Sequence, residues 1–459
     1  MQELDATLAR QTSRMNELQR QAESEPTVAS LDALASIAFE RGETLAALGR
    51  TDEAIGDQQL ATSLLTQIVA GAGRVDLVPR MRSAGERLRT FLQRQGRGQE
   101  ASVQALGEAQ LLSQLGEGEQ ALRQVDPIVA EAKAALEATR TEEALEFYVQ
   151  AATIRAGILY ALQRLDEALA TENESVVAVA SFGAGQEPFL CALRTNRALT
   201  LGALGRTDEA QAELLEVIGA YDEMLASLPD ADTVGGTVRA HNALADLLFE
   251  QGRADEAVAA LQRVATLAEP FADDAEVSAQ LRSIARKRAS AARAAGQLDE
   301  ALQHTNTWCA LAQTQAEANS TMENVEEMLE AAYDRAVLLH ETGRHDLALL
   351  DAGNLVSAWE QLAGQQSERP ELEQRVLMGL DVRERALSAL GRHDEALVDQ
   401  SRIVDTFRRM LRMGAAPQLQ QGLAMTLQHR AATHRALGNL DKAQADLQEA
   451  QRLGGGVVH

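Results

Sequence analysis

Hydrophobic residues recur at helical spacing along almost the whole chain. The first example lies within residues 2–22, where apolar positions fall on one face of a helix: Leu4, Leu8, Met15 and Leu18. The segment Ser24-Glu-Pro26 ends this pattern. From about residue 27 the helical pattern resumes, and a short glycine-containing segment interrupts it at regular intervals. The pattern therefore predicts an N-terminal amphipathic helix followed by a long series of helices joined by tight turns.

The glycine-containing segment is itself repeated. Its clearest copy is Leu390-Gly-Arg-His-Asp-Glu-Ala-Leu397, and close copies begin at Leu48 and Leu204. We call the second residue of each copy the glycine slot; it falls at positions 49, 96, 116, 163, 205, 252, 296, 343, 391 and 438, and Gln163 replaces the glycine once. From position 205 the slots are separated by 47, 44, 47, 48 and 47 residues. Two helices of about 20 residues fill such an interval, so the repeat predicts helical hairpins, in which helix A precedes each slot and helix B follows it.

The residues of the turn have separate physical roles. Glycine adopts the left-handed conformation that ends helix A without a steric penalty. The aspartate three residues after the slot is expected to be the N-cap of helix B. It occurs as Asp52, Asp166, Asp208, Asp255, Asp299, Asp346, Asp394 and Asp441. The glutamate that usually follows favours the positive end of the helix dipole, and the alanine after it allows the two helices to approach closely.

Two further positions recur in register with the slot. Eight residues before it stands an arginine followed by a small residue; these arginines are Arg41, Arg155, Arg197, Arg288, Arg335 and Arg430. They either form a ladder of ion pairs with acidic groups of adjacent helices or line a groove. Sixteen residues after the slot, Tyr221, Trp359 and Phe407 are expected to anchor the end of helix B, with a ligand-binding aromatic stripe as the alternative.

The interval between positions 96 and 163 departs from the regular spacing. The expected helices there are 76–95, 98–115, 118–138 and 141–162. The first of them has no partner in the A–B alternation, so we expect an irregular repeat near residues 70–118. The chain is then organised as an N-terminal helix (1–26), the hairpin array (27–453) and a flexible tail (454–459). No polar capping helix follows the last B helix, so either a partner subunit covers this end or its apolar face is small.

The pattern small–x–x–Leu–x–x–Leu-Gly-Arg–x–Asp-Glu-Ala-Leu resembles the tetratricopeptide repeat superfamily. The small residue is Ala198, Ala245, Ala289, Ala336 or Ala431. The long period is similar to that of kinesin light chains and many actinobacterial members, and the resemblance covers about residues 27–453. It implies an all-α fold, an α-solenoid of about 20 helices wound into a right-handed superhelix, whose A helices line a concave groove for peptides or protein segments.

The resemblance also implies which residues line that groove. These are Thr153, Tyr160, Thr195, Asn242, Asp246, Phe249, Arg286, Arg293, Tyr333, His340, Asp381, Arg385, Gln428 and Arg435. Arginines gather toward the second half of the set. Since guanidinium groups suit carboxylates, we hypothesise that this part receives an acidic side chain or a C-terminal carboxylate. The alternative is a row of solvated arginines that share no ligand.

Composition narrows the range of partners and compartments. The net charge of −25 argues against nucleic acid or an anionic membrane as the main partner. Cys191 and Cys309 stand alone, as small buried residues of a reducing compartment do. No signal-peptide core and no apolar run of membrane-spanning length is present in the sequence, which indicates a cytoplasmic protein. The near absence of lysine suggests the biased genome of a GC-rich bacterium.

The sequence offers little catalytic chemistry. Its eight histidines form no evident ligand set, and no phosphate-loop, zinc-protease or nucleophile-elbow motif occurs, so we expect no metal, no cofactor and no enzyme activity. The leading hypothesis is a scaffold or adaptor that binds a protein or peptide on its concave face. The alternatives are a peptide-responsive sensor acting on a separate effector chain, and a structural protein that forms homo-oligomers through its C-terminal end.

Overall fold

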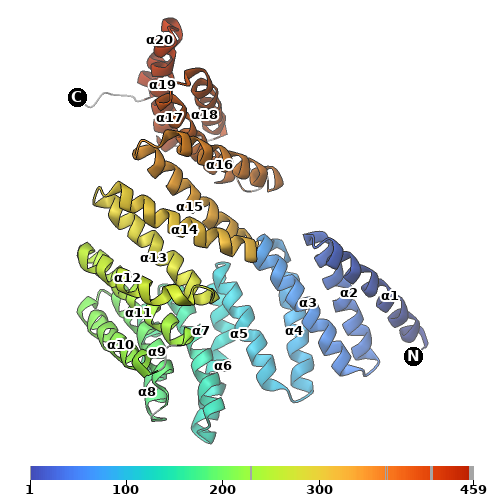
Figure 1. Cartoon of the computed structure of the whole chain (residues 1–459). Helices are drawn as coiled ribbons and strands as arrows, with labels where there is room; N and C mark the ends of the chain where they lie inside the picture. Colours follow the sequence, from blue (N-terminus) through green and yellow to red (C-terminus); the bar gives the residue numbers. More distant parts are fainter. Residues whose placement is uncertain are drawn as a thin grey trace. The chain divides into compact units, whose positions relative to one another are not determined.

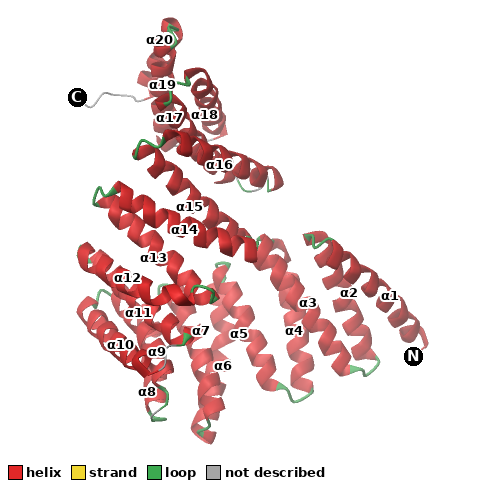
Figure 2. Ribbon diagram, viewed as in Figure 1, coloured by secondary structure: helices red, strands yellow, loops and turns green. Residues whose placement is uncertain are grey.

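The structure of the chain is a computed structural model that describes residues 2–183, 185–227, 230–366, 369, 371–413 and 417–453. Within these residues it contains twenty α-helices, two short 3-10 helices and no strand (Figure 1, Figure 2). The α-helices are α1 (Gln2–Ser24), α2 (Val28–Ala47), α3 (Thr51–Ala72), α4 (Val78–Arg94), α5 (Gly98–Gln114), α6 (Gly118–Thr139), α7 (Glu142–Ala161), α8 (Leu165–Ala180), α9 (Glu187–Ala203), α10 (Thr207–Ser227), α11 (Ala231–Glu250), α12 (Ala254–Ala268), α13 (Ala275–Ala294), α14 (Leu298–Ala318), α15 (Met322–Glu341), α16 (His345–Gln365), α17 (Glu371–Ala389), α18 (His393–Met413), α19 (Pro417–Ala436) and α20 (Leu440–Leu453). The 3-10 helices are η1 (Val75–Leu77) and η2 (Glu269–Phe271).

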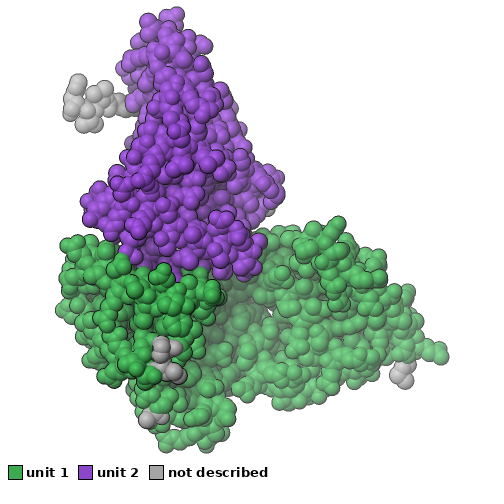
Figure 3. Space-filling model, in the orientation of Figure 1, with its two compact units in different colours: residues 1–280 green, residues 281–459 purple. Residues whose placement is uncertain are grey.

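The helices form two compact units, unit 1 (residues 1–280) and unit 2 (residues 281–459), and the division falls inside α13 (Figure 3). Within each unit, consecutive helices joined by short turns pack against each other as hairpins. This confirms the predicted all-α solenoid. The irregular repeat near residues 70–118 stays a prediction, and the expected tail (454–459) lies outside the described residues.

The apolar face expected for α1 is buried at Leu8, Met15 and Leu18, whereas Leu4 is exposed. In the described part of the chain, every helix is too short or too polar to cross a bilayer.

Each A helix ends as the glycine slot predicts. In the turn at Gly391, the slot residue has φ +74° and donates its N–H to Ser388 O at 3.1 Å, while Arg392 N donates to Leu387 O at 2.9 Å. These two bonds form a Schellman motif, which satisfies carbonyls at the end of the helix. Gln163 adopts the same left-handed conformation, with φ 59°.

The predicted N-cap role of the aspartates is wrong. In the described B helices that begin at a glycine-slot turn, the N-cap is the residue after the slot, as at Arg50, Arg164 and Arg253, and its side chain makes no capping hydrogen bond. The aspartate lies two residues later, inside the first turn, where the helix dipole favours a negative charge.

The arginine of the turn instead binds the glutamate three residues later. Arg50 donates from Nε and Nη2 to the two carboxylate oxygens of Glu53, both at 2.6 Å. The same fork joins Arg97 to Glu100, Arg164 to Glu167, Arg206 to Glu209, Arg253 to Glu256 and Arg392 to Glu395. The Gly-Arg–x–Asp-Glu sequence thus encodes an ion pair across the start of helix B.

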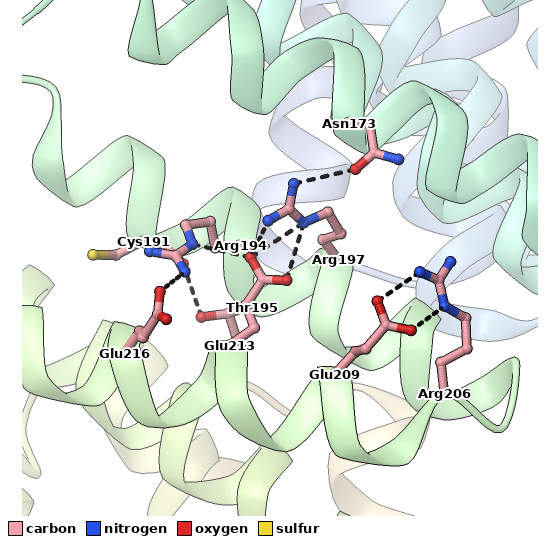
Figure 4. Close-up of polar contacts among 9 residues, drawn as sticks. All are labelled: Asn173, Cys191, Arg194, Thr195, Arg197, Arg206, Glu209, Glu213 and Glu216. Atoms are coloured by element: carbon pink, nitrogen blue, oxygen red, sulfur yellow. Dashed lines mark hydrogen bonds and ion pairs between the residues drawn. The ribbon is translucent and has the colours of Figure 1, made fainter.

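Five of the arginines eight residues before a slot form the predicted ladder of ion pairs, and Arg288, whose guanidinium pKa is lowered by burial, is not among them. Arg383 of α17 donates through Nε and Nη2 to the two oxygens of Asp399 on α18, at 2.7 and 2.6 Å. Equivalent pairs sixteen residues apart are Arg41–Asp57, Arg197–Glu213, Arg335–Asp351 and Arg430–Asp446. Figure 4 shows Arg197 directed at Glu213, which also accepts from Arg194. Arg155 is a variant, since it binds Asp126 and Thr171.

The aromatic residues after the slot are packing anchors, as expected. Tyr221 and Trp359 are buried, and Phe407 packs on the apolar cluster of α18, α19 and α20. Tyr221 lies against Gly236, and Phe407 against Gly422, so closely that a Cβ on either glycine would collide with the ring. The two cysteines are buried, and burial raises the pKa of Cys309 to about 11, so its thiol stays protonated and unreactive.

The exposed surface of α20 is relevant to the homo-oligomer that the sequence predicts at the C-terminal end. Ala443, Asp446 and Ala450 are buried against the array. The exposed residues of α20 are Leu440, Asp441, Lys442, Gln444, Ala445, Gln448, Gln451 and Arg452. Because most of these are polar, α20 offers little apolar surface, which favours the small-apolar-face alternative; self-association stays a prediction.

The left-handed slot gives a first prediction. Gln163→Gly should stabilise the protein by about 0.5–1 kcal/mol, because a non-glycine residue in this conformation costs about 1–2 kcal/mol, only partly offset by the greater freedom of glycine in the unfolded chain. Gly391→Ala should destabilise by about 1 kcal/mol for the same reason. The measurement is urea unfolding. As a control, Gly353→Ala lies inside α16 with open space around its Cβ and should stabilise; a loss of stability there, like that of Gly391→Ala, would contradict the account.

The ion-pair ladder gives a second prediction. Arg383→Leu leaves Asp399, whose side chain is 3 % exposed, without its partner, and should destabilise the protein by about 3 kcal/mol. The double change Arg383→Leu with Asp399→Ala recreates the Leu244–Ala260 pair that occupies the same positions in the α11–α12 hairpin. It should recover most of the lost stability in urea unfolding. A double variant as unstable as the single one would show that the buried charge is not the cause.

Candidate functional site

The structure brings several of the implied groove residues into three cavities, which we name by the helices that line them. The α7–α9 pocket lies in unit 1 and has a volume of about 270 Å³. The α13–α15 pocket and the α17–α19 pocket lie in unit 2, with volumes of about 380 and 370 Å³. The A helices supply most of the lining in each.

The α7–α9 pocket contains Thr153 and Tyr160 from the implied set, and α9 adds Asn196 and Thr200. Its floor is Glu172 of α8, a side chain that sequence reasoning missed. Glu172 Oε1 accepts a hydrogen bond from Thr200 Oγ1 at 2.9 Å, while Oε2 has no hydrogen-bond partner among the described residues. Burial raises the pKa of Glu172 to about 7.

A comparison between hairpins shows how unusual Glu172 is. It stands nine residues after its glycine slot, a position that most other hairpins fill with a buried apolar residue, such as Val125, Leu214, Leu261 and Ala352. Burying a carboxyl group where leucine serves elsewhere costs stability. This departure from the repeat was the available sequence signal.

The other implied residues of unit 1 do not line this pocket. Thr195 is buried and donates to Cys191 O within its own helix at 2.9 Å (Figure 4). Asn242 is buried and donates to Gln280 Oε1 at 2.9 Å. Asp246 is exposed and Phe249 is partly exposed on the same helix, α11.

The α13–α15 pocket contains Arg286 and Arg293 opposite Asp334. Arg293 donates to Glu341 Oε1 at 2.6 Å, and the Arg286 guanidinium lies over the Trp308 ring, 5.9 Å from its centroid. Burial raises the pKa of Asp334. The pocket is therefore mixed in charge, with its arginines already in contact with other side chains of unit 2.

The α17–α19 pocket contains His340 and Arg385 from the implied set. Its other lining residues are Glu384, Ser388, His393, Gln400, His429, Ala432 and Thr433. Arg385 forms an ion pair with Asp381 one turn earlier in α17. The Glu384 carboxylate is buried; it accepts from Gln400 Nε2 at 2.8 Å and lies 3.1 Å from His429 Nδ1, which raises the pKa of His429.

The remaining members of the implied set are on the same A helices of unit 2. Tyr333 is half-buried on α15, and burial raises the pKa of its phenol. Gln428 and Arg435 are exposed on α19. The four arginines proposed as one cluster are therefore divided: Arg286 and Arg293 share one pocket, Arg385 lines another, and Arg435 lines neither.

A comparison with protein-family models matches one of the hairpins. Residues 238–271, which cover most of the α11–α12 hairpin, match the family model of the tetratricopeptide repeat. The α11–α12 hairpin is therefore similar to a tetratricopeptide repeat. Repeat scaffolds of this superfamily generally bind proteins and are generally non-catalytic. Comparison with curated protein sequences gives no match.

Solved structures similar to this chain are distant in sequence. BtubC from P. vanneervenii is 17% identical with a TM-score of 0.39, over 55% of this chain and 94% of that one. A putative kinesin light chain from Podospora anserina is 20% identical with a TM-score of 0.35, over 47% and 94% of the two chains. The apo form of RapI is 8% identical with a TM-score of 0.43, over 92% and 97%.

The buried carboxyl of Glu172 gives a prediction for pH. Its folded pKa is raised from 4.5 to about 7. The contribution of Glu172 to the free energy of unfolding is therefore fully present below about pH 4.5 and is lost as the pH rises through about 7. Glu172→Gln removes the loss, so at pH 8 this variant should be more stable than the wild type by up to about 3 kcal/mol, and near pH 4.5 the two should be similar.

The measurement is urea unfolding between pH 4.5 and 8. Glu146→Gln, at an exposed position of α7, is the matched control and should leave the pH profile unchanged. If the free energies of unfolding of Glu172→Gln and the wild type differ by the same amount at every pH in this range, the raised pKa is contradicted.

Proposed function

We propose that this chain is a non-catalytic scaffold that binds a segment of a partner protein along the A helices of unit 2. The observation that supports it is that successive A helices there carry two polar pockets, each lined by groove residues implied from the sequence. Pockets spaced along neighbouring repeats suit successive side chains of an extended segment.

The chemistry of the α13–α15 pocket favours an acidic group on that partner. Arg286, Lys287 and Arg293 give the pocket more positive than negative charge, although the chain as a whole carries −25. Arg293 now pairs with Glu341, but both side chains are partly exposed, at 42% and 32%. An exposed ion pair of this kind is worth only about 0–1 kcal/mol, so a partner carboxylate can displace Glu341 at little cost.

A peptide selection tests the proposal. Random peptides displayed on phage are selected on the purified chain, and the dissociation constants of the selected peptides are measured by fluorescence anisotropy. Acidic peptides should be enriched, and Arg286→Glu with Arg293→Glu should weaken them at least tenfold, which corresponds to about 1.4 kcal/mol.

The matched control is Arg402→Glu with Arg409→Glu on helix α18. It makes the same change in net charge at two exposed arginines outside the α13–α15 pocket, and binding should be retained. An equal loss of peptide affinity in both double variants would indicate that the net charge of the chain, and not the pocket, determines binding. Failure to select any peptide, or selected peptides that are indifferent to Arg286 and Arg293, would overturn the proposal.

A further inference from the structure

The α17–α18 hairpin departs from the repeat at two buried positions. Glu384 takes the place that eight other hairpins give to a small residue: Gly42, Ala109, Ala156, Ala198, Ala245, Ala289, Ala336 and Ala431. Gln400 takes the place, nine residues after the slot, that is apolar in most hairpins. Both side chains are almost completely buried, at 2% and 1% exposed, and both line the α17–α19 pocket. Two such changes facing one cavity favour a polar or charged occupant for it.

The charged groups around Glu384 converge from two helices. Asp381 precedes Glu384 by three residues on α17, which places both carboxylates on one face. His429 reaches toward them from α19. One ligand atom from each of Asp381, Glu384 and His429 lies within 4.8 Å of the others. Two like charges at this spacing repel each other, and a cation between them would turn the repulsion into attraction.

We propose that Asp381, Glu384 and His429 bind a divalent transition-metal ion such as Zn²⁺. A mixed set of imidazole nitrogen and carboxylate oxygen suits this class of ion better than Ca²⁺ or Mg²⁺, which take oxygen alone. Arg385 contacts Oδ2 of Asp381, so the second carboxylate oxygen remains for the metal. Three protein ligands leave a coordination position for water.

The rest of the pocket fits a hydrated ion. Gln400 Nε2 donates to Glu384 Oε2 at 2.8 Å and to Thr433 Oγ1 at 2.9 Å, which fixes the orientation of the carboxylate. Gln400 Oε1, Ser388 Oγ, His340 Nδ1 and His393 Nδ1 are buried and have no hydrogen-bond partner within the described residues. Water on the metal would donate to Gln400 Oε1 and to neutral imidazole nitrogens.

The alternative occupant is a basic side chain of a partner. An ammonium group would also approach Asp381 and Glu384. It accounts less well for His429, because a metal ion binds an imidazole nitrogen together with two carboxylates, whereas an ammonium group needs only the carboxylates. Metal binding is therefore the inference that the residues favour, and it does not depend on the scaffold function proposed above.

Titration of the full chain with the metal alone tests the inference. The chain is stripped with a chelator, dialysed and titrated with Zn²⁺ by calorimetry, and with Co²⁺ to follow its visible absorption. One equivalent should bind saturably, with a Co²⁺ spectrum typical of nitrogen and oxygen ligands. Glu384→Gln and His429→Gln should each raise the dissociation constant on the order of tenfold to a hundredfold. His434→Gln, on the same helix but outside the pocket, should not.

The design separates loss of the site from loss of the fold. Circular dichroism reports whether each variant is folded, and Asp381→Asn, at a partly exposed position, serves as a second ligand variant if Glu384→Gln does not fold. Absence of one-equivalent binding would overturn the inference, as would binding that is unchanged in Glu384→Gln and His429→Gln. Binding of lysine-rich peptides that is lost in Glu384→Gln, without metal binding, would assign the pocket to a basic side chain.

Discussion

Pairing of an acidic side chain in the helix interface is the constraint that shapes five of the hairpins in the described part of the chain. When helix A packs on helix B, an acidic side chain of B enters the interface, and an isolated charge there would cost several kcal/mol. The arginine sixteen residues earlier meets both of its oxygens, as Arg383 does for Asp399. One ion pair therefore fixes the register of the two helices about their common turn. Leu244 and Ala260 take the same positions in another hairpin, which shows that the interface requires satisfied groups and matched volume rather than charge itself.

The sequence predicted the elements of local geometry well. The glycine slot specifies a left-handed residue whatever surrounds it, so the turns and most helix boundaries were found. The N-cap assignment failed because helix B begins immediately after the turn arginine, which moves the aspartate into the first turn. The glutamate partner of that arginine was visible three residues away, but its role became clear only from the geometry.

The candidate sites were much less predictable, because their residues come from different helices. His429 looked isolated in the sequence, since its partners Asp381 and Glu384 belong to an earlier A helix. Glu172, Glu384 and Gln400 were hidden in helices whose overall pattern is normal. The signal for them was internal: each occupies a buried position that most other hairpins give to a small or apolar residue. In a repeat protein the other copies act as the reference, and a polar residue at a core position points to function more directly than a recurrent one does.

The arginines fall into two groups, according to whether their acidic partner is buried or exposed. Where the acidic partner is buried, as Asp399 is at 3% exposed, the arginine cannot leave without exposing an uncompensated charge to the interior, so its role is structural. Where both partners are partly exposed, as in Arg293 and Glu341, water readily replaces either one and the pair contributes little stability. Only arginines of the second kind can exchange their partner for a ligand. We therefore expect recognition of an acidic group, as proposed above, only where an arginine is held by an exposed carboxylate, and the α13–α15 pocket is one such place.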